Sequence, residues 1–239
     1  MNACLLVLTA TLVLQAAEMP PPGWRDAMNK ALDLTLAGKD LEVVAMYETW
    51  VEEYPNFGEA RMMLGAAHES VAREARTGRY PRELRNKHYE LAILHMRTAI
   101  EKAGSRAPFD WMRSFIDIHG LIGVDRPVEY ERLVRAAVKQ YPAEPHAHAY
   151  LMALLAERSQ PLEAAAAAAR AAIPKTADAY DSVAASLAFH ARDFGPLMSA
   201  SALSALLAEA SRFVDDALKL NPKHRGAVRT KTQIEQLRK

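Results

Sequence analysis

This sequence has almost no cysteine, no excess of charge of either sign and no pattern that indicates β-structure. Its only cysteine, Cys4, lies in an apolar N-terminal stretch, so the rest of the chain can form neither disulfides nor thiolate metal sites. Thirty Lys and Arg balance 29 Asp and Glu, and the net charge of +1 gives no reason to expect a nucleic-acid partner. Only ten glycines occur and no long segment alternates apolar and polar residues, so we expect no β-sheet.

The motifs of common enzyme chemistry are also missing. The sequence has no Gly-x-Ser-x-Gly elbow, His-Glu-x-x-His helix, phosphate-binding loop or dinucleotide fingerprint. His88 and His95 share one helix face, but helical metal ligands are typically three or four residues apart rather than seven. His146 and His148 would point to different sides of a helix. We therefore expect no catalytic residue, no cofactor and no bound metal.

The first 17 residues have the pattern of a secretory signal peptide. An apolar run from Ala3 to Leu14 is shorter than the ~20 residues that span a bilayer, and small residues follow it before Pro20. No Lys or Arg precedes this run, so a retained membrane anchor and a packed first helix are alternatives. Export without disulfides is typical of the bacterial periplasm or of secretion. We expect a periplasmic or secreted protein that contacts a membrane only if this segment is retained.

Half of the residues are hydrophobic, enough for a sizeable core, and they recur at helical spacing. Pro and Gly divide the chain into segments of mostly 12 to 20 residues, which predicts paired helices with short turns. One phrase recurs: an apolar or small residue, a second after four positions, a third after three more, and Pro or Gly after another five. Its copies are Val43-Tyr47-Trp50-Pro55, Ala92-Met96-Ala99-Gly104, Tyr130-Val134-Ala137-Pro142, Leu162-Ala166-Ala169-Pro174 and Ala210-Val214-Ala217-Pro222.

This phrase resembles the second helix and terminal proline of a tetratricopeptide repeat. The first-helix signature of that family has counterparts in Leu64-Gly65 with His68, Val183-Ala184 with Leu187, and Leu151-Met152 with Leu155. In the last copy Met152 replaces a small residue, which indicates looser or shifted packing. The resemblance implies one all-α domain over residues 18–239, with antiparallel helix pairs stacked as a right-handed α-solenoid and a C-terminal capping helix over 227–238.

The period of the repeat is irregular. The terminal breakers lie at 55, 104, 142, 174 and 222, giving gaps of 49, 38, 32 and 48 residues, whereas the family's period is about 34. We therefore expect insertions near 73–87 and 194–207. The first is a candidate basic patch, made of Arg73, Arg76, Arg79, Arg82, Arg85 and Lys87. Such a run either binds an anionic partner or is a solvated helix face.

In arrays of this family the first helix of each pair lines a binding groove. The resemblance assigns Glu59, Met62, Ala66, Glu69, Ala149, Ala153, Asp178, Asp181 and Ala185 to that surface. Because these residues are acidic or small, an extended or helical segment with some positive charge would fit. The sequence thus predicts a non-catalytic scaffold that binds a protein or peptide in the bacterial envelope or secreted space. The alternative is an accessory or catalytic helical domain of an envelope enzyme system.

Overall fold

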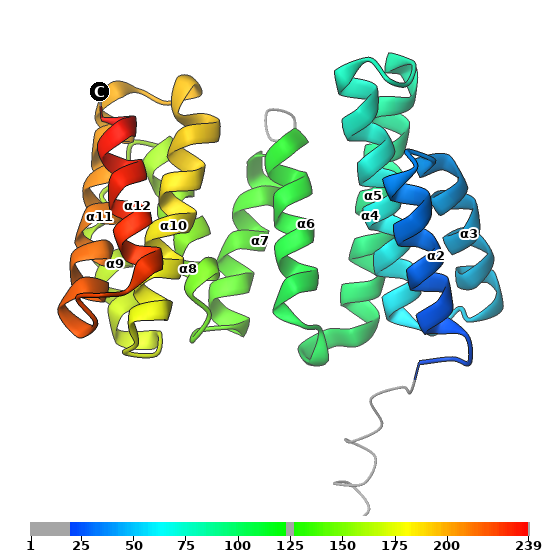
Figure 1. The fold of residues 1–239 in the computed structure, drawn as a ribbon, viewed down its shortest axis with the longest axis horizontal. Helices are drawn as coiled ribbons and strands as arrows, with labels where there is room; N and C mark the ends of the chain where they lie inside the picture. The colour runs from blue at the N-terminus through cyan, green and yellow to red at the C-terminus, as the bar shows by residue number, and fades with distance from the viewer. Residues whose placement is uncertain (1–19, 123–126, 239) are drawn as a thin grey trace, which may run out of the picture. The chain divides into compact units, whose positions relative to one another are not determined.

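The chain is all-helical in the computed structural model, which describes residues 20–122 and 127–238 (Figure 1). The α-helices are α2 (Trp24–Leu36), α3 (Asp40–Glu53), α4 (Gly58–Thr77), α5 (Arg82–Ala103), α6 (Phe109–Ile122), α7 (Pro127–Gln140), α8 (Pro145–Glu157), α9 (Glu163–Ala172), α10 (Ala177–Phe194), α11 (Ala200–Leu220) and α12 (Arg225–Leu237). Two short 3₁₀ helices accompany them, and these residues contain no strand. The predicted all-α architecture of consecutively paired helices is confirmed for these residues.

The predicted signal peptide, residues 1–17, lies outside the described residues. Among the helices that are described, none is both long enough and apolar enough to cross a membrane.

The structure divides the predicted helical-repeat domain into two compact units, Met1–Ala107 (unit 1) and Pro108–Lys239 (unit 2). Their boundary follows the 3₁₀ helix Gly104–Arg106. Proline disfavours helical backbone in the residue before it, and Ala107 is accordingly extended, with ψ of 128°. The helical run therefore stops at this point in the chain.

Unit 1 contains two helix pairs, α2–α3 and α4–α5. Gly38 makes the turn of the first pair with φ of +71°, a conformation that glycine adopts without a steric penalty. The ring of Trp24 packs at an angle against three other rings, with centroid separations of 5.8 Å to Tyr47, 5.1 Å to Trp50 and 4.9 Å to Phe57. This aromatic cluster joins α2 and α3 to the start of α4.

The α4–α5 hairpin is longer than the α2–α3 pair, because α4 has 20 residues and α5 has 22. The insertion predicted near 73–87 covers the last turn of α4, the connection after Gly78 and the first turns of α5. The two helices approach closely at Gly65, where an added Cβ would lie 2.7 Å from Cγ of Met96. The small residue of the repeat signature is therefore required by the packing of this pair.

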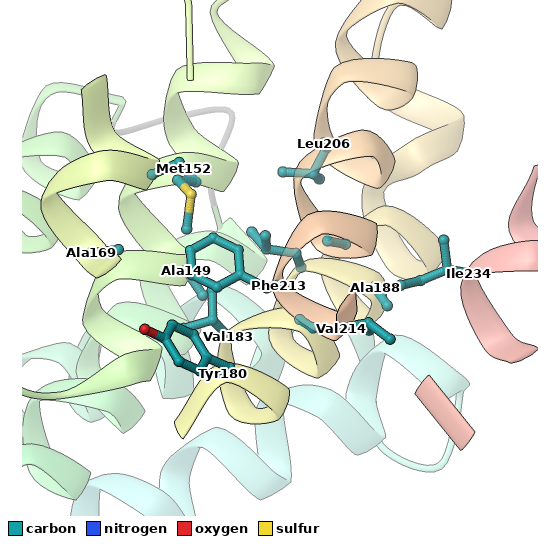
Figure 2. Packing of buried hydrophobic residues seen from close by; sticks show 14 of the residues in the cluster. Ala149, Met152, Ala169, Tyr180, Val183, Ala188, Leu206, Phe213, Val214 and Ile234 are labelled. Carbon is teal, nitrogen blue, oxygen red and sulfur yellow. The ribbon is translucent and has the colours of Figure 1, made fainter. Parts of the chain in front are cut away.

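Unit 2 contains α6 to α12, and its core cluster, which Figure 2 shows from close by, lies mainly between α8, α10 and α11. Val183, Leu206 and Phe213 are fully buried there. Met152, at which looser packing was expected, is also fully buried in this cluster.

The alanine-rich helix α9 contributes few large side chains to this core. Ala166 and Ala169 are buried, and their small size allows the neighbouring helices to come close. The guanidinium of Arg170 lies over the ring of Phe213, 4.1 Å from its centroid, and Nε donates to Asp216 at 2.9 Å. This residue ties α9 to α11.

Helix α12 closes unit 2 and has the expected character of a capping helix. Its buried side chains are Ala227, Thr230 and Ile234, and most of its other residues are polar. It sits closely on α10, since a Cβ on Gly226 would lie 2.1 Å from Oδ2 of Asp181.

Candidate functional site

An apolar groove of about 440 Å³ lies in unit 1 between α2 and α4, with α3 as its floor. We call it the α2–α4 groove. Its lining residues are Met28, Asn29, Ala31, Leu32 and Thr35 of α2, Asp40, Val43 and Tyr47 of α3, and Met63, Ala66, Ala67 and Ser70 of α4.

One wall of the groove is an exposed apolar stripe on α2. Met28 and Leu32 are four residues apart and share a helix face, with 38% and 58% of their surface exposed. A second stripe of the same helix, which includes Trp24, Ala27 and Ala31, packs into the core of unit 1. Large exposed apolar side chains beside a hollow are typical of a surface that binds another molecule.

The floor of the groove contains a buried carboxylate that is already paired. Asp40, at 4% exposure, accepts hydrogen bonds from the Ser70 hydroxyl at 2.8 Å and the Tyr80 hydroxyl at 3.4 Å. The guanidinium of Arg79 lies 3.8 Å from the same carboxylate. Because a buried charge needs such partners, Asp40 contributes to local structure and is not free to pair with a ligand cation.

Tyr47 lies on the floor of the groove, and the negative charge of Glu59 affects it. The Tyr47 hydroxyl is buried, and it has no hydrogen-bond partner among the described residues. Burial, followed by the negative charge of Glu59, raises the pKa of Tyr47 to about 12. Tyr47 is neutral near pH 7, and the charge of Glu59 contributes to the raised pKa of this groove-lining residue.

The four residues of α4 predicted for a binding surface have different positions. Ala66 lines the groove, and the charge of Glu59 affects the pKa of Tyr47 on its floor. Met62 is only 5% exposed, whereas the adjacent Met63 lines the groove. Glu69 forms an ion pair with the arginine four residues later. Of the four, Ala66 is the one that lines the groove, and Met62 is a packing residue.

The alanines predicted in unit 2 provide little accessible surface. Ala149 and Ala153 on α8 are 3% and 1% exposed, and Ala149 belongs to the core of unit 2. Ala185 on α10 is half-buried.

The two acids predicted on α10 contact the capping helix. Asp181 accepts a hydrogen bond from the Thr230 hydroxyl at 2.8 Å, and His224 Nε2 lies 2.8 Å from Oδ1 of Asp178. His224 also caps α12, because its Nδ1 accepts from the backbone N–H of Ala227 at 3.0 Å. These contacts hold α12 in place on α10.

The candidate basic patch contains residues with different environments. Arg73 pairs with Glu69, and Arg79 donates to the carbonyl of Gly38 at 2.7 Å as well as facing Asp40. Arg79 therefore fastens the end of α4 to the α2–α3 turn. The side chain of Arg76 is outside the described part of the structure. Arg82, Arg85 and Lys87 are exposed on the first turns of α5.

Sequence reasoning missed the α2 wall of the groove. Met28, Leu32 and Leu36 recur every four residues, while Trp24, Ala27 and Ala31 follow another stripe of the same helix. Among the described residues, the other helices of unit 1 cover only one of these two apolar stripes. The pattern of two stripes was the available signal.

Three histidines gather on the other side of α4, between α4 and α5. His68 Nδ1 lies 3.0 Å from His88 Nδ1, and the ring of His95 stacks on that of His68 with centroids 5.5 Å apart. His88 and His95 do share one face of α5, as the spacing predicted, but the partner that brings them together is on another helix. In the described part of the chain, no group of three or more His, Cys, Asp or Glu side chains is placed to hold a metal ion.

Comparison with known proteins gives a limited result. No family model matches the chain, and no curated protein matches it. Among solved structures, it is similar to YrrB, described as a TPR protein with an unusual peptide-binding site. The two chains are 17% identical, the match covers 86% of this chain and 90% of YrrB, and the TM-score is 0.42. The assignment of helix pairs rests on the helices and contacts described above.

Proposed function

We propose that this protein is a non-catalytic scaffold that binds a short amphipathic segment of a protein partner in the α2–α4 groove. The observation that carries the proposal is the exposed stripe of Met28 and Leu32 beside a hollow that runs between two helices. Burying apolar surface is the main favourable term in most protein association, and this stripe has no covering element among the described residues.

The dimensions of the groove suit a helical segment. Its wall on α2 extends from Met28 to Thr35, which corresponds to about 10 Å along the helix axis. That length accommodates roughly two turns of a bound helix, so the anchors would be apolar side chains at i and i+3 or i+4. An amphipathic helix laid between two helices uses the same packing that joins the repeats of such an array.

Charge favours a partner with a cation next to its apolar anchors. Glu59 precedes Met63 by one helical turn and its charge acts on Tyr47, so it lies at an edge of the groove. Asp40 is already paired with Ser70 and Arg79, so we assign the contact with a ligand cation to Glu59. A Lys or Arg one turn beyond the anchors would meet it.

The N-terminal sequence supports a location outside the cytoplasm. An apolar run followed by small residues over 1–17, in a chain with one cysteine, suits export to the bacterial periplasm or the medium. A fusion of residues 1–17 to a reporter that is active only after export would test this part: loss of export when Leu8 is changed to Arg would support it, and export that is independent of these residues would contradict it.

Binding can be tested with designed helical peptides that carry two leucines four residues apart and a lysine one turn beyond. Fluorescence anisotropy would compare the wild type with Leu32→Lys, which places a charge in the groove, and with Leu94→Lys. Leu94 is a matched control because it is 53% exposed on α5, away from the lining residues. We expect Leu32→Lys to weaken binding at least about tenfold, which corresponds to about 1.4 kcal/mol, and Leu94→Lys to leave it unchanged.

The charge contribution has its own control. Glu59→Gln should weaken the lysine peptide by roughly three- to tenfold at low salt and by less at high salt. It should not affect a peptide with serine in place of that lysine. Equal affinities of the wild type, Leu32→Lys and Leu94→Lys would show that the groove is not the binding site.

A further inference from the structure

Of the three histidines between α4 and α5, His68 and His88 are buried and His95 is half-buried, and the described groups that affect their pKa values are cations or other imidazoles. His68 is 1% exposed and His88 6%, and their ring centroids are 5.0 Å apart. Nε2 of His68 and Nδ1 of His95 are buried without a hydrogen-bond partner among the described residues. We call His68, His88 and His95 the histidine cluster.

The contact between His68 and His88 requires that at least one ring is neutral. Their Nδ1 atoms are 3.0 Å apart, so one nitrogen donates its hydrogen and the other accepts through its lone pair. If both rings were protonated, two N–H groups would face each other and two positive charges would lie in a buried site. The hydrogen bond that joins α4 to α5 here would then be lost.

The charged groups around the cluster oppose protonation. Lys87 on α5 acts on His68 and His88, and Arg61 on α4 acts on His95. Helix α3 packs on α4 as well, but its titratable groups there, Asp40 and Tyr47, face the groove.

Other histidines of the protein have the opposite environment. Three imidazoles in unit 2 lie within 2.8 Å of a carboxylate oxygen, where a positive charge is compensated. These pairs are His146 with Glu144, His190 with Glu157, and His224 with Asp178. The histidine cluster differs from these pairs because the hydrogen-bond partner of His68 is another imidazole and not a carboxylate.

Helix α4 connects the cluster to the groove. Met63, Ala66 and Ser70 line the groove from one side of α4, while Gly65 and His68 face α5 from the other. We propose that protonation of the histidine cluster loosens the α4–α5 hairpin, so that the α2–α4 groove loses its wall and releases its peptide in mildly acidic conditions. The release, but not the loosening, rests on the function proposed above.

The direction of the pH effect follows from the shifts. Burial and then the neighbouring His88, His95 and Lys87 lower the pKa of His68 to about 4, and burial with nearby cations lowers those of His88 and His95. The opened hairpin exposes imidazoles of ordinary pKa near 6.5, so it binds more protons than the closed one over roughly pH 6.5 to 4. The closed hairpin is therefore most favoured above about pH 6.5, and its population relative to the open form decreases as the pH falls toward about 4. From His68 alone, the closing equilibrium falls roughly 30-fold between about pH 7.5 and about pH 5.

Hydrogen exchange followed by mass spectrometry on the full chain tests the loosening without any ligand. The wild type and His68→Phe are compared at each pH, which cancels the intrinsic pH dependence of exchange, and amides of α10 and α11 serve as an internal control. We expect the protection of α4 and α5 amides in the wild type to fall roughly 30-fold from about pH 7.5 to about pH 5, with a much smaller fall in His68→Phe. An equal fall in both proteins, or none in the wild type, would overturn the proposal.

Two further measurements keep the proposal testable if His68→Phe folds poorly and separate it from the proposed function. NMR titration of the wild-type imidazoles should show His68 remaining neutral well below the range of a free histidine, and titration near the ordinary value would refute the mechanism. The designed peptide should bind at neutral pH and weaken in the acid range in parallel with the loss of protection. Loss of protection with unchanged affinity would overturn the coupling to the groove. Binding at neither pH would count against the proposed function, while the exchange data would still decide the loosening.

Discussion

Replacing Gly65 by alanine tests the close packing of α4 on α5. A Cβ there would lie 2.7 Å from Cγ of Met96, 3.2 Å from the carbonyl oxygen of Ala92 and 3.3 Å from the backbone nitrogen of Met96. Both neighbours are fully buried, so the thioether side chain has no open space to enter. The two backbone atoms cannot rotate away, and the helices must separate by a few tenths of an ångström.

Two effects of opposite sign determine the result. Alanine gains about 1 kcal/mol over glycine in a helix interior. Overpacking a buried site costs about 1 to 3 kcal/mol, and contact with rigid backbone favours the upper end of that range. We therefore expect Gly65→Ala to lower the free energy of unfolding by about 2 kcal/mol and the Tm by about 4 to 8 °C in a chain of this size.

Urea and thermal unfolding followed by circular dichroism measure this change. Met96→Ala and the double variant Gly65→Ala/Met96→Ala complete a cycle in which the contact with Cγ is removed and the backbone contacts remain. If the side chain is the main obstacle, Gly65→Ala becomes less harmful in the Met96→Ala background; if the backbone is, it stays as harmful. A rise in Tm on Gly65→Ala alone, by the amount of the propensity gain, would refute the reasoning.

Three other substitutions follow from the contacts described. Phe213→Ala should cost about 3 to 5 kcal/mol in urea unfolding, because it empties the centre of the unit 2 core, and a loss under 1 kcal/mol would contradict that position. Gly226→Ala should lower the Tm in the wild type and do so less when Asp181→Ala is already present, since only the 3.0 Å contact with Cε1 of His224 then remains; additive effects would argue against the contact with Asp181. Arg79→Ala should lower the free energy of unfolding by about 1 kcal/mol, a modest amount because the Arg79 side chain is 45% exposed. The control Arg82→Ala, at an exposed residue for which the described structure gives no ion pair, should leave it unchanged. Equal effects of the two substitutions would show that Arg79 does not hold α4 to the α2–α3 turn.

The arrangement of helices was predictable from local chemistry. Gly38, Pro55 and Pro142 lie in the turns between helices, and apolar residues at helical spacing identify the buried stripes of the helices they separate. The small residue expected in the repeat signature is found at Gly65, where the close approach of α4 and α5 leaves no room for a larger side chain. These features depend on a residue and its neighbours in sequence, so one sequence sufficed to find them.

The site was harder to predict because it depends on helix rotation and on contacts between distant segments. Met62 was expected at the binding surface, but Met63 lines the groove, and one residue corresponds to about 100° of rotation around a helix axis. The acids of α10 were expected to face a ligand, yet the chain's own last helix contacts them. His88 and His95 were recognised as a pair, whereas His68, which unites them, lies twenty residues away on another helix. Composition and spacing contain no information of this kind.

The two occupied sides of α4 also determine where this protein can change during evolution. A substitution that retuned the groove at Met63 or Ser70 would also disturb the core of unit 1 or the hydrogen bond to Asp40. Helix α2 has no such double constraint, because Met28 and Leu32 are exposed while its buried stripe is separate. New partner preferences can therefore arise on α2 with little loss of stability, and sequence divergence among related proteins should concentrate on its outer stripe.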